Sequence, residues 1–565
     1  MERSASQLNP QWRMLRTTAA LLLVCSFCLF LPSLFHNLFA DDDIYLAFTN
    51  RMVRHLPWTD LYQFLLKPAN PWEFLPLRDL GYWLDFRMFG DEPFGFHFSN
   101  LAWYGLSAAA FWWLIKELLL LLRPGWAGQA SILALCGTVL FVVHPAHVEA
   151  AAWVASRKDL MAGTFGFLAA ATLAHGLRVG WPCRYGLATA VLLLLACFSK
   201  AAGMTQVLFL TTLIVAAWRQ VPELAMERKI ATLMVLWVVV VFAAIVHMKV
   251  AESTGIRIEN HPGSMAVLDR ASRIFSTLGG LLLLPYPLGL YHDVYRIGEW
   301  HWLTSGVGVL LILLALAALF VRRALWPLGV VLAVVPWAVY LQIIPFTTWS
   351  MASERFLFVS VAGLAIVLVD VMGYLAQPRR IVTLLLLISV PMAMITWKRV
   401  GEWEVGATLR ALEYERQPEF HNAIRDQILP VLLSKQRYLE AETLARRVPR
   451  GYGAAALLAL VRAESAFTAW NKEREAGPPS TASRNTYCLA LTSVRQALSV
   501  GYAQIPGERD ISYNNLLRSI ERQTKIRFAH APELCEAIAA ASFDQTTKPS
   551  SSLSPVFLMQ VNNIH

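Results

Sequence analysis

Charged residues are scarce in this chain of 565 residues. Asp, Glu, Lys and Arg make up 16% of it, whereas soluble domains carry about a quarter. Hydrophobic residues make up 56%, which argues against a disordered chain, and glycine has no collagen-like period. The mean hydropathy is +0.46. The composition therefore argues against a single soluble globule and predicts that most of the chain lies in a membrane.

Cysteine is also sparse, with seven residues in all. Cys25, Cys28, Cys136 and Cys197 lie inside apolar segments, where a buried thiol behaves as a small hydrophobe. Cys488 and Cys535 are the two cysteines that the sequence singles out as a candidate disulfide. The sequence leaves open whether these two pair.

The formal net charge of +10 would favour a nucleic-acid partner in a soluble protein. Here most Lys and Arg residues stand at the ends of apolar runs, so their positions reflect membrane topology instead. No nucleic-acid partner is predicted, and the predicted partner of the apolar runs is membrane lipid.

Apolar runs that could cross roughly 30 Å of hydrocarbon recur along the first 400 residues. They predict an all-α, polytopic membrane protein of about eleven spans. The first run lacks a signal-peptide cleavage site and is followed by more membrane sequence, so it is expected to remain as an anchor. The runs cover residues 17–39, 99–122, 128–143, 160–177, 186–198, 202–218, 230–249, 303–321, 325–343, 356–375 and 380–397.

The distribution of basic residues predicts the orientation, because short cytoplasmic loops carry an excess of Lys and Arg. Basic residues precede the first run and then recur in alternate loops, for example at Arg228, Lys229, Arg379 and Arg380. The amino terminus is therefore predicted to be cytoplasmic. The predicted outer loops are residues 40–98, 144–159, 250–302 and 344–355, with a short turn at 199–201.

Residues 274–291 are apolar but are interrupted by a Gly-Gly pair and two prolines. Counting them as a span would place Arg322 and Arg323 outside. We therefore expect a re-entrant or interfacial helix that lines a cavity.

The composition changes to polar, helix-forming sequence after about residue 400. Residues 1–399 are predicted to form the multispanning module. Residues 400–545 are predicted to form a small helical domain, because apolar residues recur there at intervals of three and four. This domain is predicted to be extracytoplasmic, because an odd number of spans precedes it. A Pro/Gly/Ser-rich break at 477–483 divides the helical domain. Residues 546–565 are rich in Ser, Thr and Pro, which is typical of a disordered tail.

Three adjacent carboxylates, Asp41, Asp42 and Asp43, open the first outer loop. Their mutual repulsion raises at least one pKa, which suits a general base or a metal ligand. The alternative is a solvated acidic turn. Arg78 is a further charged residue of this loop.

The second outer loop contains the sequence HPAHVEAAAWVASRKDL. A helix that starts near Pro145 would place Glu149, Trp153 and Arg157 on one face at successive intervals of four. Such a stripe could hold a sugar and its phosphate, with Lys158 beside it. The alternative is a span-end helix whose Trp and basic residues lie at the headgroups.

Two histidines precede this stripe, and outer-edge charges follow at later spans. His144 and His147 could bind a metal or, when protonated, a phosphate, but no third ligand has a clear spacing. Lys200, Glu354 and Arg355 stand at the outer ends of spans, where ionisable groups are costly and suggest function. The alternative for Glu354 and Arg355 is a structural ion pair at a helix end.

Together these motifs resemble the GT-C glycosyltransferases, and within them the TMTC-like and protein O-mannosyltransferase-like proteins that carry tetratricopeptide-like helices. The resemblance rests on matches that occur in the family's order across residues 38–363. They are DDIYLAFTN, PLRDLGYWLDFRMFGDEPFGFHFSN, VVHPAHVEAAAWVASRKDLMAG, the Ser199–Lys200 turn, LLLPYPLGLYHD and SERFLFVSVAG.

The resemblance implies a GT-C fold and transfer of one sugar, a hexose or a pentose, from a polyprenyl-phosphate donor to an outer acceptor, a protein hydroxyl or an envelope glycan. Asp43 or Asp42 occupies the position of the catalytic base, and Glu149 would orient the acceptor or hold sugar hydroxyls. A single displacement with inversion is expected, because phosphate leaves with little need for protonation. No cofactor is certain, and a divalent metal stays open. The donor phosphate or substrate would be held by residues among Arg78, His144, His147, Arg157, Lys158, Lys200, Glu354 and Arg355.

The sequence departs from the family pattern at Leu75, Tyr104 and Ala201. These departures keep a second hypothesis open: a catalytically inactive scaffold that binds partners through its helical tail. A transporter is disfavoured because the spans carry few charges and show no repeat. A bacterial inner membrane, with the helical domain in the periplasm, is the expected location, because the outer loops contain no Asn-x-Ser/Thr sequon.

Overall fold

The computed structural model is built from helices. It describes residues 10–37, 50–70, 73–180, 183–218, 226–254, 266–290, 292, 294, 297–321, 324–343, 351–404, 409, 412–413, 416, 429–446, 454–478 and 480–503. No strand occurs in these ranges. The chain forms two compact units, which are residues 1–258, 268–344 and 350–406 on the one hand, and residues 259–267, 345–349 and 407–565 on the other.

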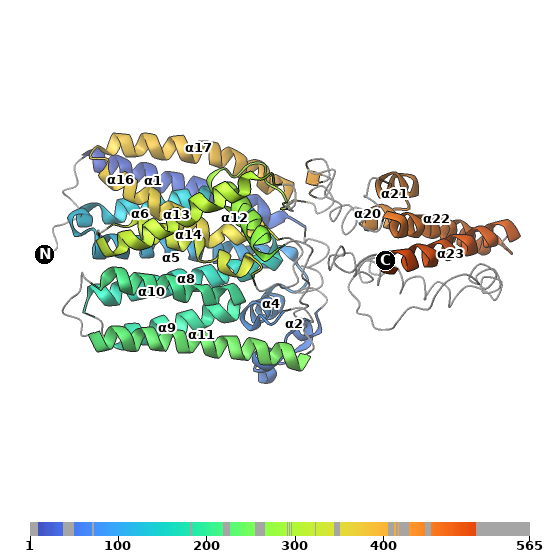
Figure 1. Ribbon diagram of the computed structural model, residues 1–565, viewed down its shortest axis with the longest axis horizontal. Coiled ribbons are helices and arrows are strands. Elements are labelled where there is room, and N and C mark those ends of the chain that lie inside the picture. Colours follow the sequence, from blue (N-terminus) through green and yellow to red (C-terminus); the bar gives the residue numbers. More distant parts are fainter. Residues whose placement is uncertain are drawn as a thin grey trace. The chain divides into compact units, whose positions relative to one another are not determined.

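The first unit is a helical bundle (Figure 1). Eight of its described helical segments are long and apolar enough to cross a membrane. The helices α9, α10 and α14 with α15 are apolar but shorter, and they coincide with the other predicted runs. The all-α, multi-pass prediction is thus confirmed. The eight are built on α1 (Pro10–Cys28), α5 (Pro93–Leu122), α6 (Ala130–Val143), α8 (Arg157–Arg178), α11 (Met226–Thr254), α13 (Trp300–Val321), α16 (Phe358–Tyr374) and α17 (Pro378–Glu402).

The remaining helices of this unit are short or lie outside the long spans. The helix α12 covers much of the segment predicted to be re-entrant, and it ends before the first proline. The bounds are α2 (Arg51–His55), α3 (Gln63–Leu66), α4 (Pro76–Phe89), α7 (His147–Ala152), α9 (Cys183–Ser199), α10 (Gln206–Ala217), α12 (Val267–Leu283), α14 (Trp326–Val334) and α15 (Trp337–Tyr340).

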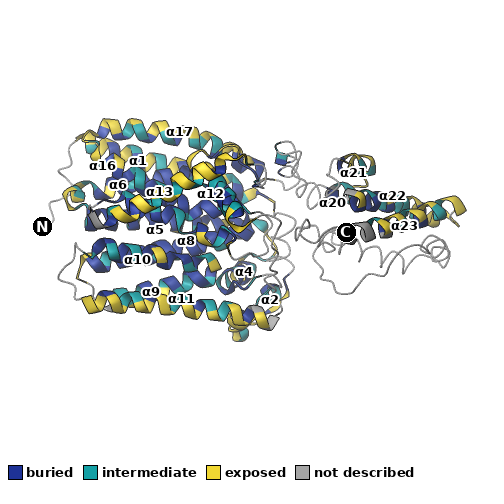
Figure 2. Cartoon of the chain, in the orientation of Figure 1, coloured by how far each residue is buried: buried dark blue, intermediate teal, exposed yellow. Residues whose placement is uncertain are grey.

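The bundle has an interior layer and a lipid-like exterior. The helix α8 buries 83% of its most apolar stretch, whereas α11 and α13 each bury 11%. Figure 2 shows the exposed faces of the peripheral helices in yellow. These faces carry large apolar side chains such as Phe242 and Leu313. A soluble monomer rarely exposes so much contiguous apolar surface, so the exterior fits a hydrocarbon solvent.

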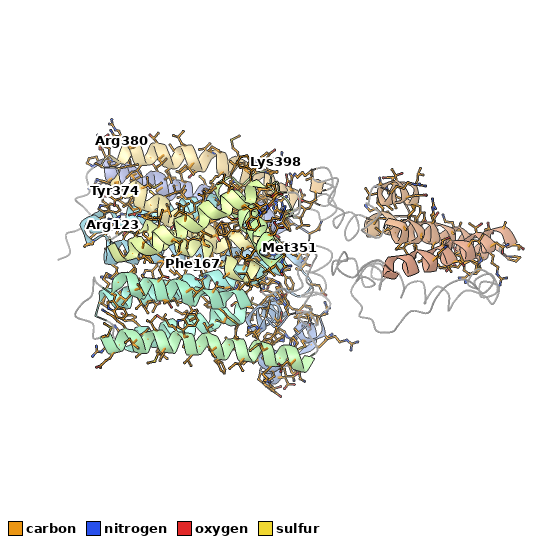
Figure 3. The ribbon with its side chains drawn as sticks, viewed as in Figure 1. Arg123, Phe167, Met351, Tyr374, Arg380 and Lys398 are labelled. Atoms are coloured by element: carbon orange, nitrogen blue, oxygen red, sulfur yellow. The ribbon has the colours of Figure 1, made fainter. Side chains whose placement is uncertain are left out.

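Aromatic rings fill the centre of the bundle. Phe141 of α6 contacts Phe111 of α5, Phe167 of α8 and Phe358 of α16, with ring centroids 4.8, 5.7 and 5.4 Å apart. Each of these helices therefore contributes aromatic side chains to one shared core. Burial of these large apolar surfaces stabilises the packing of the helices. Figure 3 labels Phe167 in this central region.

One end of the bundle is fixed by Asp370 of α16. Its Oδ1 accepts hydrogen bonds from Arg123 Nη2 at 2.8 Å and Nε at 3.1 Å, and its Oδ2 accepts from the backbone N–H groups of Leu325 and Trp326. A carboxylate at the start of α14 satisfies N–H groups that a helix leaves unpaired. Arg123 also donates to the Tyr374 hydroxyl at 2.6 Å. Figure 3 labels Arg123, Tyr374 and Arg380 at this end and Met351 and Lys398 at the other.

The described helices of the second unit pack around a small core of their own. The structure confirms helices in the predicted polar region, and the predicted break falls between α22 and α23, where Gly477 has a φ of 154°. Trp470 and Tyr487 stack with their ring centroids 5.4 Å apart. Cys488 is disulfide-bonded, while its candidate partner Cys535 and residues 546–565 lie outside the described residues. The helices are α20 (Leu429–Ser434), α21 (Tyr438–Ala445), α22 (Ala454–Ala476) and α23 (Thr481–Ala503).

Candidate functional site

The described candidate residues gather at one end of the bundle, because the helices that carry them begin or end there. The helices α6 and α9 end just before His144 and Lys200, whereas α8 and α16 begin at Arg157 and just after Arg355. Ion pairs then connect these loops to one another, as described below. The separate loops that carry Glu149, Arg355 and Lys200 thus meet in the fold.

Arg355 and Glu149 form the centre of this site. The Arg355 guanidinium is ion-paired with Glu149, and the Arg355 backbone N–H donates to Glu149 Oε2 at 2.8 Å. The guanidinium carbon also lies 5.0 Å from the ring centroids of Trp153 and Phe356. A buried carboxylate, a cation and two aromatic faces therefore share one location.

Lys200 also lies close to the Phe356 ring. Its ammonium Nζ is 2.5 Å from Asp159 Oδ1 and 5.2 and 5.4 Å from the ring centroids of Tyr340 and Phe356, which stack on each other at 3.8 Å. A cavity of about 30 Å³ is lined by these groups and by Arg355. Two cations from separate segments thus face one small cavity.

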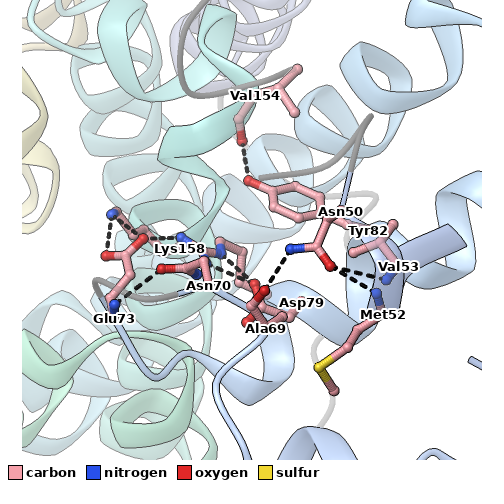
Figure 4. Close-up of polar contacts among 11 residues, drawn as sticks. Asn50, Met52, Val53, Ala69, Asn70, Glu73, Asp79, Tyr82, Val154 and Lys158 are labelled. Atoms are coloured by element: carbon pink, nitrogen blue, oxygen red, sulfur yellow. Dashed lines mark hydrogen bonds and ion pairs between the residues drawn. The ribbon is translucent and has the colours of Figure 1, made fainter. Parts of the chain in front are cut away.

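Glu73 joins two further predicted cations. Lys158 Nζ lies 2.7 Å from Glu73 Oε2, and the Arg78 guanidinium is ion-paired with both Glu73 and Asp79 (Figure 4). Burial alone would raise the pKa of Glu73, but the positive charges of Arg78 and Lys158 outweigh it and hold that pKa below its ordinary value. Glu73 is therefore a carboxylate with a fixed negative charge.

Arg157 is separate from the cavity. It is ion-paired with Asp85, and it donates from Nε to Asn100 Oδ1 at 2.7 Å and from Nη2 to the Phe96 carbonyl at 2.8 Å. The predicted stripe of Glu149, Trp153 and Arg157 is wrong, because α7 ends at Ala152 and Trp153 has extended backbone dihedrals. The break turns Arg157 away from Glu149, and it becomes the first residue of α8.

Glu354 and Arg355 have different partners and belong to two different clusters. Glu354 Oε1 accepts from the Gly289 backbone N–H at 2.6 Å and from Arg399 Nη2 at 3.2 Å, and His292 Nε2 lies 3.7 Å away. These contacts join the segment after α12 to α16 and α17. Glu354 and Arg355 thus do not pair with each other: Glu354 pairs with Arg399, and Arg355 pairs with Glu149.

His144 and His147 make different contacts, and their ring centroids lie 6.0 Å apart. His144 Nε2 lies 3.3 Å from the Leu282 carbonyl oxygen, and His147 Nδ1 lies 3.1 Å from the Tyr104 hydroxyl. Burial lowers the pKa of His144 to about 4, so this imidazole is neutral near pH 7 and does not serve as a cationic phosphate ligand. In the part of the chain that the structure describes, no group of three or more His, Cys, Asp or Glu side chains fits a metal ion.

The predicted catalytic acids Asp42 and Asp43, with Asp41, lie outside the described residues. The segments that flank them are described. Before them, the Asn37 backbone N–H donates to the Glu404 carbonyl at 3.2 Å, and after them Asn50 caps α2.

Sequence reasoning missed the acidic partners Glu73 and Asp159 and the cation Arg399. The cations themselves could have pointed to these partners, because a buried cation needs a carboxylate or several hydrogen-bond acceptors nearby. The predicted outer loops 40–98, 144–159, 250–302 and 344–355 carry acidic residues beside their cations, whereas the turn at 199–201 carries Lys200 and no acid. Which acid meets which cation depends on the fold, because the pairs join residues as far apart as Glu149 and Arg355.

Comparison of the sequence with protein-family models and with curated proteins, and of the structure with solved structures, finds no match.

Proposed function

We propose that the chain is a membrane glycosyltransferase of the GT-C type. It transfers one sugar from a polyprenyl-phosphate donor to an acceptor on the outer side of the membrane. The observation that carries this proposal is the cavity at one end of an apolar bundle, which Lys200 and Arg355 line from two separate segments. A leaving phosphate needs cations that are already in place as its charge develops.

In this proposal the donor phosphate binds at Lys200 and Arg355, with Lys158 nearby. The donor phosphate is a diester with one negative charge, and it takes the place of Asp159 and Glu149 as the partner of these cations. Its charge grows toward that of a dianion as the sugar leaves, and charge-assisted hydrogen bonds from two cations in a region of low dielectric then bind it more strongly. Glu149, once released, can hold sugar or acceptor hydroxyls. The exposed apolar side chains of Leu283, Leu284 and Tyr286 at the end of α12 provide an apolar surface beside the site for the polyprenyl chain.

The reaction is a single displacement with inversion. The acceptor hydroxyl oxygen forms a bond to the anomeric carbon while the bond from that carbon to the phosphate oxygen breaks. The bonding electrons leave with the phosphate, and the hydroxyl proton moves to Asp43 or Asp42 as the base. Arg355 and Lys200 stabilise the phosphate charge that develops.

The helical second unit would present the acceptor in the extracytoplasmic space, which for a bacterial inner membrane is the periplasm. The disulfide at Cys488 supports this location, because disulfides persist in oxidising compartments. The positive-inside distribution of Lys and Arg supports a cytoplasmic amino terminus in the same proposal.

A second candidate function is the inactive scaffold. The observation that favours it is that Lys158, Lys200, Arg355, Arg157 and Arg78 are all paired with carboxylates. The charges of such a site already balance, and its cavity is small, at about 30 Å³. The scaffold would use these pairs for stability and its helical tail for binding.

Lipid binding separates the two candidates. Undecaprenyl phosphate and the neutral alcohol undecaprenol are titrated against the purified full chain in nanodiscs. We expect preference for the phosphate, and Lys200→Gln should weaken it roughly 10- to 100-fold, the value of one charge-assisted hydrogen bond. The double variant Lys200→Gln with Asp159→Asn leaves no buried charge unpaired. It should therefore fold, and it separates loss of phosphate binding from loss of folding.

The matched control is Lys249→Gln, since Lys249 is a surface cation of α11 with a side chain 75% exposed. Its phosphate affinity should equal that of the wild type. Equal affinity for phosphate and alcohol, or no effect of Lys200→Gln, would overturn the donor-phosphate assignment. In cells, Asp43→Asn should leave the protein abundant while an acceptor loses a hexose-sized or pentose-sized mass; unchanged glycosylation would remove Asp43 as the base.

A further inference from the structure

Residues 50–70 form a closed loop that a single side chain ties at both ends. Asn50 Oδ1 accepts from the backbone N–H groups of Met52 and Val53 at 3.0 and 3.3 Å and so caps α2. Its Nδ2 donates to the Ala69 carbonyl at 2.7 Å (Figure 4). The amide group thus joins the first residue of the loop to Ala69 near its end, which restricts the conformation of the loop.

One face of this loop is fixed to α4. Leu56 and Phe64 pack with Trp83 in a buried cluster, and Trp83 Nε1 donates to the Leu56 carbonyl at 2.8 Å. Arg87 Nη2 donates to the same carbonyl at 3.0 Å. The loop is therefore held by both apolar contacts and hydrogen bonds, and its outward residues have a defined position.

The opposite face is also apolar, although nothing in the described residues covers it. The exposed fractions of Trp58, Tyr62, Leu65 and Leu66 are 66, 57, 51 and 61%. We call these four residues the loop face. Trp58 is held in place by an edge-to-face contact with Trp83, with ring centroids 4.4 Å apart. Exposed basic residues flank the loop face at Arg51, His55 and Lys67.

The loop lies at the ends of the bundle helices. Phe74, which follows the loop, packs its ring 5.3 Å from that of His247 on α11, and α4 contacts α5 and α9. Figure 1 shows α2 and α4 at the end of the bundle where α11 ends. Lipid headgroups would surround this position if the exposed apolar face of α11 is in hydrocarbon.

We propose that the loop face inserts into the boundary between headgroups and acyl chains of the lipid bilayer. Trp and Tyr favour this depth because an apolar ring and a polar group are combined in one side chain. The two leucines supply apolar area, and the flanking cations suit anionic headgroups. A protein partner is the other occupant that such a face could take. Continuity with the membrane-facing helices and the cationic rim favour the bilayer.

This insertion sets the depth of the neighbouring polar cluster. Glu73 follows Leu66 by only a few residues and is paired with Lys158 and Arg78. With the loop face in the interface, this cluster lies at the level of the lipid headgroups. The inference does not depend on the proposed transferase activity.

A fluorescent probe measures the depth directly. Leu66→Cys and, separately, Tyr62→Cys are labelled with an environment-sensitive fluorophore in a full-length parent with Cys25→Ala and Cys28→Ala, because these two cysteines are exposed. The unsubstituted parent gives the background. Each labelled protein is placed in nanodiscs of phosphatidylcholine and phosphatidylglycerol that contain lipids spin-labelled near the headgroup or near the chain end.

The matched control is Leu439→Cys, because Leu439 of the second unit is an exposed leucine too, at 80%. Both loop probes should emit at shorter wavelength than the control. Lipids labelled near the headgroup should quench them at least about twofold more than lipids labelled near the chain end. Emission and iodide quenching equal to those of the control would show a water-facing loop and overturn the proposal, leaving a protein partner as the occupant.

Discussion

Glu149 of α7 and Arg355 at the start of the α16 segment are 206 residues apart in sequence and form a buried ion pair. A second hydrogen bond, from the Arg355 backbone to the same carboxylate, fixes the orientation of the pair. The pair therefore joins the segment after α6 to the segment before α16, and Arg355 lines the same cavity as Lys200.

Breaking this pair from one side should be costly. Glu149→Gln leaves a buried guanidinium without its carboxylate, so we expect the free energy of unfolding to fall by roughly 3–5 kcal/mol. Arg355→Met should cost a similar amount. The double variant should be less destabilised than the sum of the two single variants, because it leaves no unpaired charge. Thermal unfolding in nanodiscs measures the stability of the wild type, the two single variants and the double variant. If the destabilisation of the double variant equals the sum of the two single effects, the two side chains do not form a direct pair.

Gly363 of α16 and Gly329 of α14 let two helix backbones meet. A Cβ added at Gly363 would lie 2.3 Å from the Ala333 backbone nitrogen and 2.4 Å from the Gly329 carbonyl oxygen. Gly363→Ala should therefore force α14 and α16 apart and lower stability by roughly 1–3 kcal/mol. Thermal unfolding of the purified protein tests this.

The control for that substitution is Gly306→Ala in α13. A Cβ there has no heavy atom within 4 Å, and Ala has a higher helix propensity than Gly by up to about 1 kcal/mol. This variant should match or exceed the wild-type midpoint. If both glycine variants change stability alike, close packing of α14 and α16 is not the cause.

Stability should fall as the pH falls below 6.5. Burial lowers the pKa of His144 from 6.5 to about 4, so between these values the unfolded chain binds a proton that the folded chain does not. Stability is then present above pH 6.5 and is lost toward pH 4, by roughly 3 kcal/mol at most. Glu73 adds a loss below its ordinary pKa of 4.5, because Arg78 and Lys158 lower its pKa in the folded state.

The unfolding midpoint in nanodiscs between pH 7.5 and 4 checks this dependence. His144→Asn should have a flatter profile between pH 6.5 and 4, because Asn does not titrate. A wild-type profile without a slope in this window, or an unchanged slope in the variant, would remove His144 as the source.

The disulfide at Cys488 should stabilise the second unit. Cys488 is buried against α22 and lies next to Tyr487, which stacks on Trp470. Cys488→Ser should lower the stability of this unit by roughly 2–4 kcal/mol, the usual range for removal of a disulfide. Limited proteolysis of the full chain should then cleave residues 429–503 faster, while the first unit stays resistant. Dithiothreitol should reproduce the effect in the wild type and change nothing in the variant.

The sequence predicts the spans well because each span depends on local composition. Hydrocarbon leaves no water for backbone groups, so a run of apolar residues has to form a helix whatever its neighbours are. The eight long helices and the three shorter ones coincide with the predicted runs for this reason. The break between α22 and α23 was also predictable, since proline and glycine act on the backbone next to them.

The segment between α6 and α8 shows where local reasoning fails. A helix through Glu149, Trp153 and Arg157 is favoured by sequence spacing, yet the chain turns at Trp153. Asn100 Nδ2 donates to the Trp153 carbonyl at 2.9 Å, and Tyr82 donates to the Val154 carbonyl at 2.9 Å. Two side chains of other helices thus satisfy carbonyls that a continuous helix would have used, and tertiary contacts override the local preference.

Local composition is enough to predict that this protein is helical and crosses a membrane, and that many of its charged residues lie in loops or at span ends. Which charges meet depends on how distant segments pack: Lys200 with Asp159, Lys158 with Glu73, and Arg355 with Glu149. The difference lies in the distances over which these forces act. Hydrophobic burial of a span depends on consecutive residues, whereas an ion pair forms between atoms only a few ångströms apart, and packing of distant helices sets that distance.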